Sequence, residues 1–161
     1  MKKIIAMVID EFDQAILEIV QRDNQRSHAS IGEDVNLSAS SVRRRLAKMR
    51  ESGVITADVS LVDPAKQGLT FIVHVSFARE DPEIYTAFKA QMIADPTVSQ
   101  CYHISGDEDF VLIVHATNPE AFELWGTDAL MANGAIRRYS TSLVWSRSKF
   151  TTHIMMADRT S

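Results

Sequence analysis

The segment 38–55 constrains the fold more than any other part of the chain. Its apolar residues Val42, Leu46 and Met49 recur at the spacing of one face of an α-helix. Ser38 is a good N-cap for such a helix. The remaining faces are basic or small and polar, because Lys and Arg residues crowd positions 43–50. The pattern predicts an amphipathic helix with one buried face, ending near Gly53.

A second, shorter helix is predicted immediately before it, over 28–35, from Ile31 and Val35 at positions i and i+4. Asn36 follows where the chain must turn, and asparagine tolerates the left-handed conformation that ends many helices. Leu37 can fill the turn. Two helices joined by a turn of three to four residues have the spacing of a helix-turn-helix. A further helix, capped by Asp10, is predicted to run to about residue 22.

The basic helix has the composition of a DNA-recognition helix. Short hydroxyl side chains allow close approach to a groove, and arginines reach phosphates and guanine edges. A basic amphipathic helix can equally be an ordinary solvated surface helix, but the helix-turn-helix spacing favours contact with DNA. The net charge of −4 does not oppose it. The formal charges of residues 1–60 sum to zero, so the whole net negative charge lies in the rest of the chain. Affinity for DNA depends on the local charge of the binding surface, not on the total.

The chain shows no pattern typical of secretion or membrane insertion. The apolar run 4–9 is too short for the core of a signal peptide, and no later run approaches the length of a membrane span. We therefore expect a cytoplasmic protein. Cys101 is the sole cysteine, which excludes an internal disulfide and makes a thiolate metal cluster implausible.

Beyond the helix-turn-helix the periodicity changes. Residues 54–62 are predicted to form a strand or wing, closed by a turn at Asp63 and Pro64. Strands are then predicted at 70–78, 98–105, 110–117 and 136–145, and helices at 82–94 and 119–133. This is the βαββαβ order of a ferredoxin-like fold. We predict an α+β protein with a winged helix-turn-helix domain at 1–63 and a ferredoxin-like (RAM-type) domain at 64–161. Such a sheet leaves one face to be covered, often by a second subunit, so we expect a homodimer.

Short motifs follow one another along the chain in a specific order. They comprise Ile9, Asp10, Asp13, Ile16 and Leu17; then Leu37, Ser38, Ser40, Val42, Arg44, Arg45 and Leu46 with 53–55; then Asp63, Pro64 and Gly68; then Val98, Cys101, Ser105, Gly106, Asp107, Asp109 and Phe110; and finally Lys149, Thr151 and Thr152. Each motif alone is weak. Their order and spacing resemble the Lrp/AsnC (feast/famine) family of prokaryotic transcription regulators over nearly the full chain.

The resemblance implies a nucleoid-associated regulator that binds double-stranded DNA as a dimer, with assembly to tetramers or octamers. The residues it implies for DNA contact are Ser38, Ser40, Ser41, Arg43, Arg44, Arg45 and Lys48. Arg45 lies nearer the buried edge of the helix, which favours a phosphate contact or a structural role. Paired half-sites are expected about one helical turn of DNA, or a multiple of it, apart.

The family places a small effector, commonly an amino acid, near the turn that follows the second ferredoxin-like strand. Here the residues expected to bind it are Ser105, Gly106, Asp107, Asp109 and Thr141, with possible help from Ser140 and Ser142. A carboxylate suits an α-ammonium group, and backbone N–H groups at a glycine turn suit an α-carboxylate. The alternative is a hairpin turn with solvated carboxylates.

Two departures from the family pattern concern the second helix and its turn. Asn36 stands where the family usually has glycine, and the turn geometry tolerates it. Gly32 stands where alanine is expected, which by propensity should cost about 0.5–1 kcal/mol of helix stability. Tyr139, near the effector region, stands where threonine is common, so the identity of the ligand is open.

Two other functions remain as alternatives. The first is an enzyme similar to the Lrp-related siroheme decarboxylases, in which His and Arg side chains act on a tetrapyrrole; here His103 has no neighbouring arginine. The second is a sensor that has lost DNA binding. We expect no catalytic residues, cofactor or metal, because the histidines, at positions 28, 74, 103, 115 and 153, lack the spacing of ligands.

Overall fold

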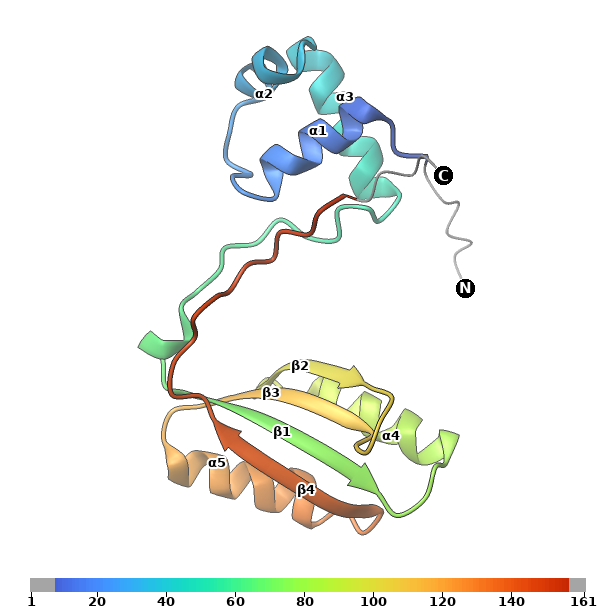
Figure 1. Ribbon diagram of the computed structural model, residues 1–161, viewed down its shortest axis with the longest axis vertical. Coiled ribbons are helices and arrows are strands. Elements are labelled where there is room, and N and C mark those ends of the chain that lie inside the picture. Colours follow the sequence, from blue (N-terminus) through green and yellow to red (C-terminus); the bar gives the residue numbers. More distant parts are fainter. Residues whose placement is uncertain (1–7, 157–161) are drawn as a thin grey trace. The chain divides into compact units, whose positions relative to one another are not determined.

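The structure is a computed structural model that describes residues 8–156 of the chain (Figure 1). Its contacts divide the chain into two compact units. One unit is the segment Val62–Ser148, and the other combines residues 8–61 with residues 149–156. No helix of the described residues is long and apolar enough to cross a bilayer.

The first unit is a bundle of three helices, α1 (Glu11–Val20), α2 (His28–Val35) and α3 (Ala39–Glu51). Each helix begins at a side chain that accepts a backbone N–H: Asp10, Ser27 and Ser38 respectively. At α1 this becomes a reciprocal capping box between Asp10 and Asp13. The helices share a core formed by Ile16, Leu17, Ile31, Val35, Val42, Leu46 and Met49. The predicted helix-turn-helix is confirmed.

The turn between α2 and α3 depends on two residues with unusual backbone requirements. Asn36 ends α2 in the left-handed conformation, with φ 56° and ψ 43°, as predicted. Gly32 is buried, and the amide of Leu37 donates to its carbonyl at 2.9 Å. A Cβ at Gly32 would lie 2.3 Å from the carbonyl oxygen of Leu37. The expectation that Gly32 merely weakens the helix is therefore wrong. The backbone of Leu37 passes so close to Gly32 that the methyl group of an alanine would clash with it.

The predicted wing is not present as a strand. Residues 54–62 adopt an irregular path after the positive φ (77°) of Gly53, and no strand of the described chain pairs with them. A strand without a partner leaves its backbone groups to water, so an alternating pattern alone cannot hold it. Val59, Leu61 and Val62 are consequently exposed, by 66%, 60% and 71%. A short 3₁₀ turn, Pro64–Lys66, follows under the cap of Asp63.

The second unit has the predicted βαββαβ order. Its elements are β1 (Leu69–Phe77), α4 (Pro82–Ala94), β2 (Val98–His103), β3 (Phe110–Ala116), α5 (Pro119–Gly126) and β4 (Ile136–Leu143). The strands form one antiparallel sheet in the order β2-β3-β1-β4. The helix predicted over 119–133 is α-helical only to Gly126 and continues as a π-helical segment, Thr127–Met131.

Both helices of this unit pack on the same face of the sheet. Phe88 and Met92 of α4 lie in one core with Val73 and Leu112, and the ring of Phe122 in α5 stacks on Phe71 at 3.8 Å. The opposite face carries residues such as Ile72 and His74, which pair in register with Ile113 and Val111. These residues are half-buried, and no helix of this unit covers their face of the sheet. The sheet therefore has one covered and one open face.

The C-terminal residues 149–156 make their contacts with the helical unit, whereas the predicted second domain was 64–161. Gln21, the C-cap residue of α1, forms two hydrogen bonds with the backbone of Ile154, at 3.1 and 2.9 Å. His153 Nε2 lies 2.8 Å from Glu18 Oε2, and Met156 packs against the helical core. The chain thus leaves the first unit near residue 61 and returns to it, a pairing of distant segments that no local pattern encodes.

Candidate nucleic-acid interface

The recognition-helix candidate α3 divides sharply between a buried and an exposed side. Val42 and Met49 are fully buried, and Leu46 is 2% exposed. The exposed positions on the remaining faces include Ser40, Arg43, Arg44, Ala47 and Lys48. The predicted division of the helix is confirmed, so these side chains project away from the core.

The N-terminal turn of α3 carries a cluster of three hydroxyl groups. Ser38 Oγ accepts the amide of Ser41 at 3.2 Å, and it lies 3.0 Å from the hydroxyls of both Ser40 and Ser41. Small hydroxyls beside free helix N–H groups are suited to phosphate oxygens. Ser38, however, already serves as the cap, so it is less free to reorient than Ser40.

Three cationic side chains of α3 have no hydrogen-bonding or ionic partner among residues 8–156: Arg43, Arg44 and Lys48. Most arginines of the described chain do form ion pairs. The three cations lie on the exposed side of the helix, within two turns of each other. They form a local positive surface, hereafter the basic face, that can neutralise phosphates.

Arg45 is committed to the interior of the helical unit. Its Nη1 lies 2.8 Å from Asp13 Oδ1 and 2.7 Å from Asp10 Oδ2, and its guanidinium sits 5.4 Å from the ring centroid of Phe12. The hydrogen bonds to Asp13 and then Asp10 raise the pKa of Arg45 above its usual value. Of the two roles that the sequence left open for Arg45, these contacts support the structural one.

Arg50 is likewise occupied, by Asp58 at 2.8 Å in the irregular segment after α3. The hydrogen bond from Arg50 lowers the pKa of Asp58. The basic stretch of the sequence therefore supplies fewer free charges than its composition indicates. Asp58 stands where the family commonly has an aromatic residue, and its separation of eight residues from Arg50 gave no helical spacing that could have revealed the pair.

In the second unit, the acidic turn 105–109 separates into residues with different surroundings. Asp109 is engaged internally: its Oδ2 accepts the amide of Phe77 at 2.7 Å, and its Oδ1 accepts the phenol of Tyr85. The bond to Asp109 raises the pKa of Tyr85 to about 12. With both oxygens occupied, Asp109 supports the turn and is a poor candidate for an effector ligand. Ser105 and Gly106 are exposed, and Gly106 has a φ of 139° that suits glycine.

Asp107 lies beside two arginines that the sequence analysis did not single out. Asp107, Arg137 and Arg138 line an open depression of about 520 Å³. Arg138 lies 3.6 Å from Glu108, whereas Arg137 has no acidic partner within the described residues. Thr141 is not among the lining residues, because its register position opposite Val73 lies further along β4. Only the strand register reveals that the turn meets the start of β4.

Among the described residues, no group of three or more His, Cys, Asp or Glu side chains is arranged to hold a metal ion. His115 pairs with Thr70 at 3.1 Å and His153 with Glu18. Cys101 is half-buried, and burial raises the pKa of its thiol.

The fold and the basic face define a helix-turn-helix DNA-binding regulator joined to a ferredoxin-like sensing unit. Family models agree: residues 9–50 match the AsnC-type helix-turn-helix domain, and residues 70–154 match the Lrp/AsnC ligand-binding domain. The chain belongs to the Lrp/AsnC family of transcriptional regulators.

Individual relatives give the same assignment. The HTH-type transcriptional regulator y4tD of Sinorhizobium fredii is 37% identical over 91% of this chain and 88% of its own. An AsnC family regulator from Agrobacterium tumefaciens matches in structure with a TM-score of 0.82 and 31% identity, over 90% of this chain and 95% of its own. A Neisseria meningitidis transcriptional regulator, solved as a complex with L-Met, matches with a TM-score of 0.83 and 26% identity, over 91% and 96%.

Proposed function

We propose that α3 binds the major groove of operator DNA through its basic face, with Ser40 and Ser41 approaching the backbone. The observation that carries this proposal is the set of three unpartnered cations, Arg43, Arg44 and Lys48, opposite a fully buried apolar stripe. Such a helix can enter a groove without disturbing its own core. Arginine side chains at its exposed side can reach guanine edges or phosphates.

The binding species in this proposal is a homodimer formed through the open face of the sheet. Half-buried Ile72, Val111 and Ile113 on that face support pairing with a second copy, because a four-stranded sheet leaves apolar area to be covered. A two-fold dimer presents two copies of α3 to half-sites separated by about 34–36 Å or a multiple of it. Further assembly to tetramers or octamers would extend the same arrangement on DNA, in the cytoplasm and on the nucleoid.

The effector in this proposal is an amino acid held at the depression beside the acidic turn. In this proposal Arg137 binds an α-carboxylate and Asp107 binds an α-ammonium group, and the exposed residue Gly106 precedes Asp107 in the turn. The complex of the Neisseria relative with L-Met supports an amino acid as the class of ligand. Effector binding that favours one assembly would change the affinity for paired half-sites by linkage.

Footprinting on the DNA upstream of the protein's own gene, with and without each of the protein amino acids, tests the proposal. We expect protected half-sites at helical spacing, and at least one amino acid that alters protection by the wild type but not by Arg137→Ala. Arg79→Ala is a matched control, because Arg79 pairs with Asp81 and does not line the depression. Absence of any sequence-preferring protection would overturn the DNA-binding role, and an unchanged effector response in Arg137→Ala would overturn the ligand site.

The enzymatic alternative has less support. The relatives described above are transcriptional regulators, and the basic face of α3 has no role in tetrapyrrole chemistry. Titration with siroheme, followed by absorbance, distinguishes the two functions. We expect no spectral change on addition of the protein, and a saturable shift of the tetrapyrrole bands would favour the enzyme.

A further inference from the structure

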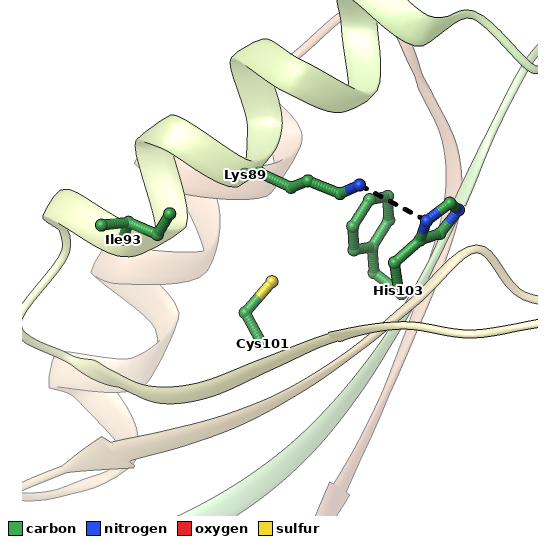
Figure 2. Close-up of a pocket in the computed structure, with 5 residues that line it drawn as sticks. Lys89, Ile93, Cys101 and His103 are labelled. Atoms are coloured by element: carbon green, nitrogen blue, oxygen red, sulfur yellow. Dashed lines mark hydrogen bonds between the residues drawn. The ribbon is translucent and has the colours of Figure 1, made fainter. Parts of the chain in front are cut away.

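A second cavity lies in the ferredoxin-like unit, between α4 and β2. It has a volume of about 190 Å³ and is lined by Lys89, Ile93, Cys101, His103 and Phe110. None of these residues lines the depression at Asp107 and Arg137. Figure 2 shows Lys89 and His103 reaching toward each other from the helix and the strand, with Ile93 one helical turn away and the Cys101 sulfur directed toward α4.

One end of the cavity is cationic. Lys89 Nζ lies 3.4 Å from His103 Nδ1 and 5.7 Å from the centroid of the Phe110 ring. No carboxylate of the described residues pairs with Lys89. Because Nδ1 of His103 faces an ammonium group, this nitrogen acts as the acceptor, and the imidazole carries its proton on Nε2. Lys89 thus places a positively charged group at this end of the cavity.

The rest of the cavity is apolar. The ring of Phe110 is fully buried, and His103 stacks on it with 4.8 Å between ring centroids. Burial raises the pKa of the Cys101 thiol, so this group remains neutral. Ile93 is 84% exposed at the rim, which leaves an apolar side chain without cover. A cation at one end and apolar walls at the other fit an amphiphilic anion.

Size and charge narrow the ligand class. The volume is below the range of about 300–1,000 Å³ typical of sites for drug-sized ligands, so the ligand must be small. A free amino acid would bring its α-ammonium group beside Lys89, and no lining residue is acidic. Two like charges placed next to each other without a counter-ion repel, so this position disfavours the ammonium group.

We propose that this cavity is a separate binding site for a small aliphatic carboxylate that lacks an amino group, such as a short branched fatty or 2-oxo acid. Lys89 binds the carboxylate, His103 borders it, and the tail contacts Phe110, Cys101 and Ile93. The site is independent of the amino-acid site proposed above. It would let the sensing unit respond to the deaminated counterpart of an amino acid as well as to the amino acid.

The single cysteine of the chain makes this proposal directly testable, because alkylation reports on one position only. The rate at which iodoacetamide modifies Cys101 is measured by mass spectrometry with 4-methylpentanoate, 4-methyl-2-oxopentanoate or leucine present. Either acid should slow alkylation, by roughly tenfold at ten times its dissociation constant, since only the unliganded fraction reacts. Leucine should not protect Cys101.

Two variants control for the chemistry and the fold. Lys89→Met keeps an unbranched side chain one atom shorter than lysine and removes the charge, so protection should be lost. Lys66→Met removes a charge from the 3₁₀ turn outside the cavity and should leave protection intact. Circular dichroism confirms that each variant is folded, and Lys89→Arg should keep part of the protection.

Three results would overturn the proposal: no protection of the wild type by either acid, equal protection by leucine, or undiminished protection in Lys89→Met. None of them bears on DNA binding or on the Arg137 site, which footprinting measures separately.

Discussion

Arg45 Nη1 lies 2.8 Å from Oδ1 of Asp13, a residue that is 2% exposed, and this ion pair joins α3 to α1. The arginine in the middle of the basic helix therefore holds the recognition-helix candidate against the bundle. Its neighbours Arg43 and Arg44 remain without partners among the described residues. Three consecutive arginines thus divide into one that fixes the helix and two that are available to a ligand.

Arg45→Met is expected to destabilise the helical unit by about 1–3 kcal/mol, because it leaves the buried Asp13 carboxylate without its cation. The value is below that of a fully buried pair, since the Arg45 side chain is 23% exposed. Urea denaturation measures the change in the free energy of unfolding. Arg22→Met, which breaks the exposed Arg22–Glu18 pair, is the control and should cost much less stability than Arg45→Met, because solvent screens this pair. Equal effects of the two variants would contradict a structural role for Arg45.

Gly32→Ala is expected to destabilise the protein, although alanine is the better helix former. The added Cβ would lie 2.3 Å from the Leu37 carbonyl oxygen, so the turn into α3 must shift. Ala29→Gly, at an exposed position of the same helix, should cost only about 0.5–1 kcal/mol. Thermal unfolding of both variants measures the difference. An increase in melting temperature for Gly32→Ala would mean that helix propensity outweighs the clash.

Tyr85→Phe should destabilise the second unit by about 1–2 kcal/mol, because the Asp109 carboxylate loses a donor. The raised pKa of Tyr85, about 12, has a second consequence. The folded state retains the phenolic proton at a pH where the unfolded state loses it, so stability should fall as the pH rises from 10 toward 12. Ultraviolet titration should show one late-ionising tyrosine in the wild type and none in Tyr85→Phe. Identical titrations would refute the contact with Asp109.

Docking of the C-terminal segment should weaken in acid. The hydrogen bond from His153 lowers the pKa of Glu18 below its usual 4.5. Because the pKa of Glu18 is lower in the docked state, ionised Glu18 stabilises that state at pH values above 4.5. This contribution is lost as the pH falls through the lowered pKa. Hydrogen exchange at the amide of Ile154, which donates to Gln21, should therefore accelerate below pH 4.5 beyond its intrinsic dependence. In Glu18→Gln this additional acceleration should be absent.

Local signals in the sequence were sufficient for most of the helices and strands and for the turn between α2 and α3. The bounds of α2, the cap at Ser38 and the left-handed Asn36 all follow from side chains within four residues of the feature. The βαββαβ order was also predictable, because alternating strands and proline-started helices are local patterns.

The remaining features depend on contacts between distant residues. The pairing of His153 with Glu18 spans 135 positions, and the juxtaposition of Asp107 with Arg137 follows from strand register. The predicted wing failed for the related reason that a strand needs a partner and residues 54–62 have none in the described chain. The internal hydrogen bonds of Asp109 were not predictable from the sequence, because its donors, Phe77 and Tyr85, lie on β1 and α4.

The salt dependence of DNA binding tests the central claim, that the basic face of α3 contacts DNA, most directly. Fluorescence anisotropy on an operator fragment, at several salt concentrations, compares the wild type with Arg44→Ala and with Arg79→Ala as the charge-matched control. We predict weaker binding by Arg44→Ala. If Arg44 contacts a phosphate, the slope of log affinity against log salt should fall by about one; if it contacts a base, the sequence preference should relax. Arg79→Ala should match the wild type. An unchanged affinity, slope and sequence preference in Arg44→Ala would contradict the account.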